Sequence, residues 1–421
     1  MIAENYLPAV RWVITGLLVF IACASAHAQV WTLESSVERA TGVAPEMRAA
    51  EAEVGARAGE RVQAGAWPNP TVEVRADEKL GLDDGRGGYS LNQISITQPI
   101  PLRRLVHQRR AAEAGLNSAR AGQQHQRLQL EARTALAFHA LQFTAERWRL
   151  AEERFKFAEG LHPGTDRLVR YLSPLERARL DILRESGQQD VAQAEGKWSE
   201  ALAQFRTLLS LPLDELPTTT PLTPVDATAD LRLLSEGLAS HPALRAAQQA
   251  RAASRASVDV ARSQRFADPT ISFFREQDVF SGSRREYTGV MLGVQFPLWN
   301  FNGGGVARAV AESDKVEASL AVQQRDLESR LRQNHLHLGH LIEQAEHHRT
   351  RLLAPARQVL DLTRKGFASG EQNGLALVDA SNTYFETRAR YLELLRDAWS
   401  EAAELRLAAG NSVLNMTEAK P

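Results

Sequence analysis

The feature that most constrains the fold of this 421-residue chain is an internal duplication. Asn69-Pro70 opens a segment that closes at Pro101-Leu102. Roughly 200 residues later, Asp268-Pro269 opens a second segment of the same kind, which closes at Pro297-Leu298. Because a duplicated sequence folds into a duplicated structure, we predict two similar halves that share one body.

Each of the two segments has the pattern of a strand pair. In residues 71–98, apolar side chains such as Val72 and Val74 alternate with polar ones such as Glu73, on both sides of a glycine-rich loop. The same alternation occurs in residues 270–296. A period of two is typical of a strand with one apolar and one polar face. We therefore expect four strands, two in each half.

The rest of the chain has the pattern of unusually long helices. No proline interrupts residues 103–161, and at 1.5 Å per residue a helix over them is roughly 85 Å long. Leucines three or four residues apart, including Leu331, Leu338, Leu341 and Leu352, form a seam typical of coiled coils. Periodicity and the proline or glycine breaks predict helices at 32–65, 103–161, 173–211, 231–265, 306–365 and 375–409.

The first 28 residues are predicted to be a cleaved secretory signal peptide. Arg11 precedes the apolar run 12–24, which is too short to span a bilayer, and Ala26-His27-Ala28 matches an A-x-A cleavage site. A membrane anchor is the alternative. The only cysteine, Cys23, lies in this segment, so the mature chain is expected to have no disulfide. The sequence does not determine whether Cys23 carries a lipid.

A proline-rich linker separates the two halves. Residues 29–211 are predicted to be the first repeat and residues 231–410 the second, with the linker at 212–230. Each repeat would consist of a strand pair followed by a helical hairpin. The polar residues 411–421 are expected to form a loose tail.

The composition excludes several classes of function. The formal net charge is −1, which gives no support to nucleic-acid binding. Hydrophobic residues make up 43% of the chain, enough for a sizeable core. No HExxH, CxxC or GxSxG motif is present, and Gly303-Gly304-Gly305 lacks the lysine and hydroxyl residue of a phosphate loop. We therefore predict a protein that is not an enzyme and has no cofactor.

The strand pairs cannot form a stable sheet by themselves. An isolated hairpin is marginal in water, and four strands are too few to close a barrel. Several copies of the chain, each adding four strands, would close one and remove the exposed edges. A small soluble sheet that caps a helical bundle satisfies the same alternation. The residues alone leave both arrangements open.

The proline-containing blocks resemble those of the TolC-type outer membrane efflux protein family. The resemblance rests on their order and spacing: Asn69-Pro70 with residues 98–102, then Asp268-Pro269 with residues 296–304. The second block is most similar to the CzcC-like branch, which serves heavy-metal and cation efflux. The resemblance covers residues 32–410. It implies a mostly α fold with a small membrane β-barrel: a long coiled-coil helical tunnel and four barrel strands per protomer, internally duplicated and trimeric.

The family also implies a location and partners. Three chains would form a barrel of about 12 strands in the outer membrane lipid, with a helical domain in the periplasm. The tunnel would dock on a periplasmic adaptor protein, which joins it to an inner-membrane pump of the resistance-nodulation-division type. A type I secretion channel and a periplasmic adaptor or scaffold protein are the alternatives. Whether the substrate is a metal, a drug or a polypeptide does not follow from the sequence.

Two helix turns match the hairpin tips that meet the adaptor in the family. They are residues 172–176 and 373–377. The alternative is an ordinary turn between helices. The residues expected to contact the adaptor are Leu172, Ser173, Leu175, Gly374 and Leu375.

Asp379 is the candidate for a gate. It matches the second of two gating aspartates in the better-known branch of the family, and Ala376 stands where the first would be. Three copies of Asp379 would attract cations in a narrow constriction. The alternative is a solvated charge on a helix surface.

Histidines are concentrated near the C-terminal half of the long second-repeat helix. Five lie within His335–His348, and imidazole binds zinc and copper. No cysteine or carboxylate completes a tight ligand set in this stretch, so no metal site is predicted. The sequence leaves open whether the cluster contacts a metal.

Overall fold

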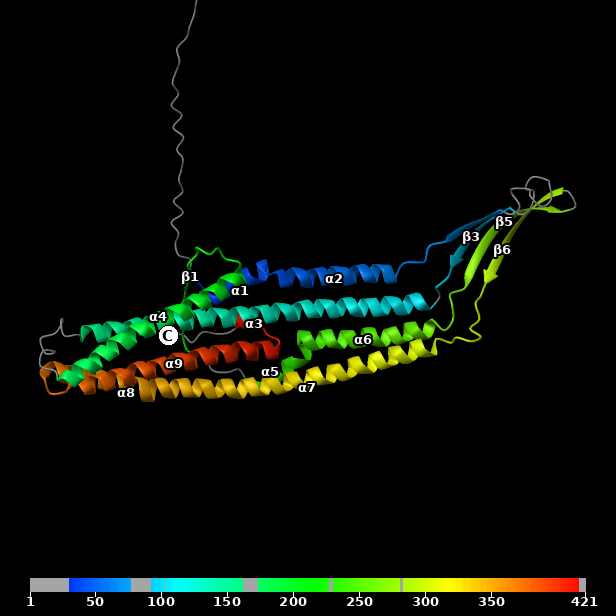
Figure 1. Ribbon diagram of the computed structural model, residues 1–421. Helices are drawn as coiled ribbons and strands as arrows, with labels where there is room; N and C mark the ends of the chain where they lie inside the picture. The colour runs from blue at the N-terminus through cyan, green and yellow to red at the C-terminus, as the bar shows by residue number, and fades with distance from the viewer. Residues whose placement is uncertain are drawn as a thin grey trace, which may run out of the picture.

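The computed structural model describes residues 30–76, 92–101, 103–161, 173–226, 230–280 and 283–415. The described chain is a long, thin rod, with a sheet at one end and the tips of two helical hairpins at the other (Figure 1). The predicted signal peptide, Cys23 and Leu172 lie outside the described residues.

Most of the helices lie side by side in one layer, whereas the helix at 174–209 crosses its neighbours obliquely (Figure 1). In the half nearer the sheet, the order is α2 (Pro45–Ala64), α3 (Arg104–Gly160), α6 (Pro242–Ser263) and α7 (Gly303–His347). In the other half, the order is α4 (Pro174–Leu209), α3, α9 (Gly374–Ala409) and α8 (Ala354–Ser369). Shorter segments are α1 (Leu33–Val43), α5 (Leu231–Gly237), the 3₁₀ turns η2 (Leu238–Ser240) and η4 (Val413–Asn415), and the π-helical η3 (His348–Leu353).

Among the described helices, none combines the length and the apolar character that a membrane-spanning helix needs.

The four predicted strands form one antiparallel sheet. Its order is β2 (Thr71–Ala76), β3 (Asn92–Pro99), β5 (Thr270–Phe280) and β6 (Ser283–Gly293), so the two repeats meet where β3 pairs with β5. Strand β6 differs from the prediction, because residues 283–286 continue the ladder with the end of β5. A small parallel pair, β1 (Val30–Trp31) with β4 (Thr218–Thr219), ties the start of the described chain to the linker.

Two helices that were predicted to be continuous are each divided at a proline. The prediction of one helix over 32–65 is wrong, because the chain is extended at Ala44 and α2 begins at Pro45. The predicted helix 231–265 is divided among α5, η2 and α6, with His241 extended before the proline that starts α6. Proline disfavours the helical conformation in the residue before it and fits the first helical position.

The leucine seam of α7 is confirmed only up to the π-helical segment. Leu331, Leu338 and Leu341 are buried, but Leu352 is 45% exposed. The wider turn of η3 rotates Leu352 out of the seam. Pro355 follows in α8, where it has no N–H to donate and its ring crowds the carbonyl four residues earlier, which accounts for the local widening.

Both repeats place a tryptophan against α3. The sequence Trp-Ser-Glu-Ala occurs at Trp198 in α4 and again at Trp399 in α9. The ring of Trp198 lies 4.9 Å from that of Trp148, and the ring of Trp399 is stacked on His139 at 4.3 Å. Because Trp148 and His139 both belong to α3, this one helix binds the two repeats together.

A buried polar network holds the linker against α3 and α9, beside the stacked rings of His139 and Trp399. The Nδ1 atom of His139 lies 2.8 Å from Oε1 of Gln142, whose amide donates to the carbonyl of Thr220 at 2.8 Å. The indole N–H of Trp399 donates to the carbonyl of Thr223 at 2.7 Å. Burial lowers the pKa of His139 to about 4, because the charged ring would lose its hydration, and the bond to Gln142 opposes this only in part.

The start of the predicted tail is packed against the body of the protein. Val413 is buried in a cluster with Val37 and Ala132, and the hydroxyl of Ser412 donates to the carboxylate of Glu131. Burial of Val413 favours an ordered position for residues 411–415, which composition alone did not indicate.

We predict that His139 makes the stability of the helical layer depend on pH. Its pKa is about 4 in the folded chain and about 6.5 when unfolded, so below pH 6.5 protons bind the unfolded state preferentially. The stabilisation is complete above pH 6.5 and is lost as the pH falls toward 4. Between pH 7.5 and pH 5 the loss should be about 2 kcal/mol.

Chemical denaturation at both pH values, followed by circular dichroism, would measure this effect. The variant His139→Gln does not titrate at this position, so it should lose correspondingly less stability over the same interval. An equal loss in the two proteins would contradict the assignment to His139.

Candidate functional site

The first hairpin tip is closed by a reciprocal cap. Ser173 Oγ accepts the backbone N–H of Glu176 at 3.3 Å, and Oε2 of Glu176 accepts the backbone N–H of Ser173 at 2.9 Å. Pro174 occupies the first turn, where its missing N–H costs nothing. The next residue, Leu175, is 64% exposed. This tip therefore combines a rigid backbone with an exposed apolar side chain.

The second tip repeats this design with different residues. Gly370 ends α8 in the left-handed conformation, with φ of 80°. Asn373 then caps α9, with its Oδ1 accepting the N–H of Ala376 at 2.8 Å. Gly374 is buried, and Leu375 is 43% exposed. Leu175 and Leu375 thus occupy equivalent positions in the first turns of α4 and α9.

Glu176 joins the two tips. Its Oε1 atom accepts the backbone N–H of Gly374 at 3.3 Å. The N–H of a residue in the first helical turn has no partner within its own helix, and Ala376 has no side chain that reaches back. The contact is supported by a shared apolar cluster below it, formed by Leu161, Leu180, Leu360, Phe367, Leu377 and Ala380.

The hydrogen bonds at the tips also keep Glu176 ionised. The hydroxyl and N–H of Ser173, and then the N–H of Gly374, lower the pKa of Glu176, although burial acts in the opposite direction. A carboxylate is also favoured at a helix N-terminus. The Ser-x-x-Glu spacing is a visible sequence signal for the cap, but no sequence signal indicated the bond to Gly374.

Asp379 lies about one turn beyond Leu375 on α9. Its side chain is exposed, and it forms no salt bridge with any residue of the described ranges. Its backbone carbonyl accepts the hydroxyl of Thr383 at 3.0 Å. The carboxylate is thus available to solvent, and its role as a gate stays a prediction.

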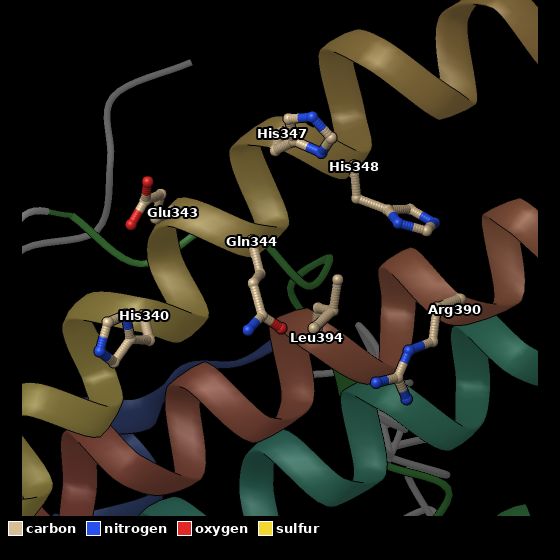
Figure 2. Close-up of a pocket in the computed structure, with 7 residues that line it drawn as sticks. All are labelled: His340, Glu343, Gln344, His347, His348, Arg390 and Leu394. Atoms are coloured by element: carbon tan, nitrogen blue, oxygen red, sulfur yellow. The ribbon is translucent and has the colours of Figure 1, made fainter.

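The histidines of α7 are spread along a groove beside α9. The groove has a volume of about 450 Å³ and is lined by His340, Glu343, Gln344, His347, His348, Arg390 and Leu394 (Figure 2). His337 lies nearby, with Nδ1 3.0 Å from Oε2 of Glu401. Within the part of the chain that the structure describes, no three His, Cys, Asp or Glu side chains are grouped to hold a metal.

The sheet has one apolar face. Its register aligns Val72, Ile96, Phe273 and Val290 across the four strands, and all four side chains are exposed. The next row, which begins at Glu73, points to the other face. An exposed apolar face of this kind requires a cover that the described chain does not supply.

Comparison with known proteins agrees with this architecture. Residues 233–411 match the family profile described as outer membrane efflux protein. Over this segment the chain is similar to the outer membrane efflux proteins. Solved structures that share its fold include the outer membrane channels OprN and MtrE.

The similarity extends over almost the whole chain. The chain is 24% identical to the cobalt-zinc-cadmium resistance protein CzcC of Cupriavidus metallidurans over 388 residues, which is 89% of this chain and 88% of CzcC. The open state of the MtrE outer membrane channel of Neisseria gonorrhoeae superposes with a TM-score of 0.75, at 18% identity, over 90% of this chain and 89% of MtrE. CusC superposes with a TM-score of 0.70, at 16% identity, over 90% and 92% of the two chains.

We predict that Glu176→Ala loosens both tips. The change removes the cap of α4 and the acceptor of the Gly374 N–H, and loss of a helix cap costs about 1 kcal/mol. Hydrogen exchange at Gly374 and in the first turn of α4 should accelerate about fivefold or more.

The matched control is Glu195→Ala, which removes an exposed glutamate from the middle of α4. It should leave exchange at both tips unchanged. If Gly374 exchanges at the wild-type rate in Glu176→Ala, the two tips are not joined through this side chain.

Proposed function

We propose that three copies of this chain form the outer membrane channel of a tripartite efflux system and export divalent heavy-metal cations. The observation that carries the substrate class is the similarity to CzcC over nearly nine-tenths of both chains. The name of that relative specifies cobalt, zinc and cadmium resistance. Residue ranges 29–211 and 231–410 would serve as two repeats of each protomer, joined by the linker at 212–230.

The single layer of helices supports assembly from several copies. Stable domains bury the apolar faces of their helices between two layers, and this layer has none above it. At one edge of the layer, Ala50 is the only buried residue within α2. At the other edge, α7 has few buried residues along its 45 positions. Edges that are this open favour side-by-side packing against further copies, which closes a tube.

The sheet supports the same arrangement at the other end of the rod. Among the described strands, β2 and β6 have one neighbour each, so their outer edges carry unpaired backbone groups. Pairing β6 of one copy with β2 of the next removes these edges. The apolar face then contacts lipid and the polar face lines the pore, which assigns outer membrane lipid and the chain itself as partners.

The opposite end is the proposed contact with a periplasmic adaptor protein, and through it with an inner-membrane pump. Leu175 and Leu375 are exposed there on a firmly capped backbone. Leu172 and Ser173 of the first tip complete the proposed contact, and Gly374 of the second, which is buried, contributes through the backbone that carries Leu375. Exposed apolar residues that are surrounded by polar ones are typical of such interfaces.

The test uses a host that depends on the matching adaptor and pump but lacks its own channel. The chain should restore growth in cobalt, zinc or cadmium salts and should crosslink as a trimer in the outer membrane. Leu175→Glu and Leu375→Glu should abolish resistance while the trimer persists, because a buried unpaired charge is costly at an interface. Leu213→Glu is the matched control, since Leu213 is 88% exposed in the linker.

Several results would overturn the proposal. A soluble monomer would exclude the channel assembly, and a trimer that exports only polypeptides would favour the type I secretion alternative. Resistance that survives both tip variants would show that the adaptor binds elsewhere.

We also predict that Asp379→Asn reduces the cation selectivity of the pore. Three carboxylates near a three-fold axis would raise the local concentration of cations, and removal of the charges abolishes this effect. In planar bilayers, cation conductance and block by divalent ions should both decrease. Asp361→Asn, a change at an exposed residue of α8, is the control. Unchanged conductance and block in Asp379→Asn would identify Asp379 as a surface charge.

A further inference from the structure

One face of α7 carries two histidines on either side of a carboxylate. Glu343 follows His340 by three residues and precedes His347 by four. Side chains at these spacings are neighbours on a helix, with about 5–6 Å between their Cβ atoms. All three side chains are exposed at the groove beside α9, with Glu343 between the two histidines along the helix (Figure 2). Each histidine can therefore reach an ion that Glu343 holds.

A third histidine is oriented by the neighbouring helix. Nε2 of His348 lies 3.0 Å from the carbonyl oxygen of Thr387 on α9. A carbonyl only accepts, so the ring donates through Nε2, and in the neutral ring Nδ1 is left with a free lone pair. A bond of this kind from the second ring nitrogen is a regular companion of metal-binding histidines. His348 points toward α9 at the end of the groove (Figure 2).

Two of the arginines near the groove are paired with glutamates. Arg390, which lines it, forms a salt bridge with Glu393 at 3.0 Å. Arg349 is paired with Glu346 at 2.8 Å. Glu343 has no such partner among the described residues, so its charge is available to a mobile cation.

We propose that His340, Glu343 and His347 form an exchangeable site for divalent transition-metal cations, with Glu343 as a ligand shared between the two histidines. Imidazole and carboxylate together suit zinc and cobalt ions, and water completes the coordination. The inference rests on the proposed metal efflux, because it assigns to this groove a role in handling the same cations.

Coordination of the metal ion by only two protein ligands at a time suits a transport channel. A closed site with three or four protein ligands holds zinc tightly and releases it slowly, whereas transport requires binding weak enough to allow departure. No three such side chains are grouped among the described residues, so the proposed site is confined to Glu343 with one histidine at a time.

The experiment measures binding of Zn²⁺ alone to the full chain, purified in detergent, by equilibrium dialysis at pH 7.5. Glu343→Gln removes the shared ligand and should raise Kd about tenfold or more, since even loss of an outer-shell partner costs 10–100-fold. His340→Gln and His347→Gln should each have a smaller effect, because the other histidine still pairs with Glu343. The double variant should match Glu343→Gln. Binding of Co²⁺, followed by its visible absorption, should show the same order.

His107→Gln on α3 is the matched control and should bind as the wild type does. The inference is overturned if Glu343→Gln binds Zn²⁺ as tightly as wild type, or if His107→Gln loses as much affinity. A measurement of metal resistance in cells tests the proposed function separately from this inference. A chain that confers resistance without binding Zn²⁺ contradicts only this inference, and one that binds through Glu343 without conferring resistance contradicts only the metal export.

Discussion

The structure depends on one uninterrupted helix. Helix α3 runs the length of the rod and contacts α2, α4, α6 and α9, so each shorter helix is positioned against it. Side chains such as Leu116, Leu130 and Phe138 are fully buried along it, whereas the edge helices bury few. Together with α9, this helix supplies most of the buried side chains of the layer, and burial of apolar surface stabilises the chain. A break in α3 would separate the sheet from the tips.

Polar side chains stabilise the region where α6 begins and α9 ends. The ends of helices leave backbone N–H and carbonyl groups without partners in the helix. His241 donates through Nε2 to the carbonyl of Leu407 at 3.1 Å and accepts the N–H of Ala243 through Nδ1. Gly410, with φ of 72°, lies so close to the His241 ring that any Cβ would collide with it. Together with the network around His139, these contacts use neutral imidazole, since burial lowers the pKa of both histidines.

Sequence periodicity was sufficient for elements whose limits are set locally. The helices predicted at 103–161, 173–211 and 375–409 are confirmed to within about two residues, as are the start of β5 and the pairing within each hairpin. Pro45 and Pro242 were also local signals of a helix break, but the alanine-rich periodicity on both sides of each proline favoured one continuous helix. Pro355, which accounts for the π-helical turn before it, was a local signal of the same kind.

Other features depend on contacts that no local pattern encodes. The bond from Glu176 to Gly374 requires two tips almost 200 residues apart in sequence to meet. The burial of Val413 requires the apolar cluster that α1, α3 and α9 form together. In the groove beside α9, the sequence showed the histidines, but their relation to Glu343, Thr387 and Arg390 follows from helix phase and from the neighbouring helix.

The hydrogen bond between the two tips joins a side chain of one hairpin to a backbone N–H of the other. This difference affects how the two halves of the chain can diverge. The first repeat contributes a side chain, which many single substitutions at position 176 would weaken or abolish. The second contributes a main-chain N–H, which every residue except proline also provides. Natural variation can therefore adjust the strength of the joint through one copy of the duplication, while the other is free to change its surface for a new partner without releasing its neighbour.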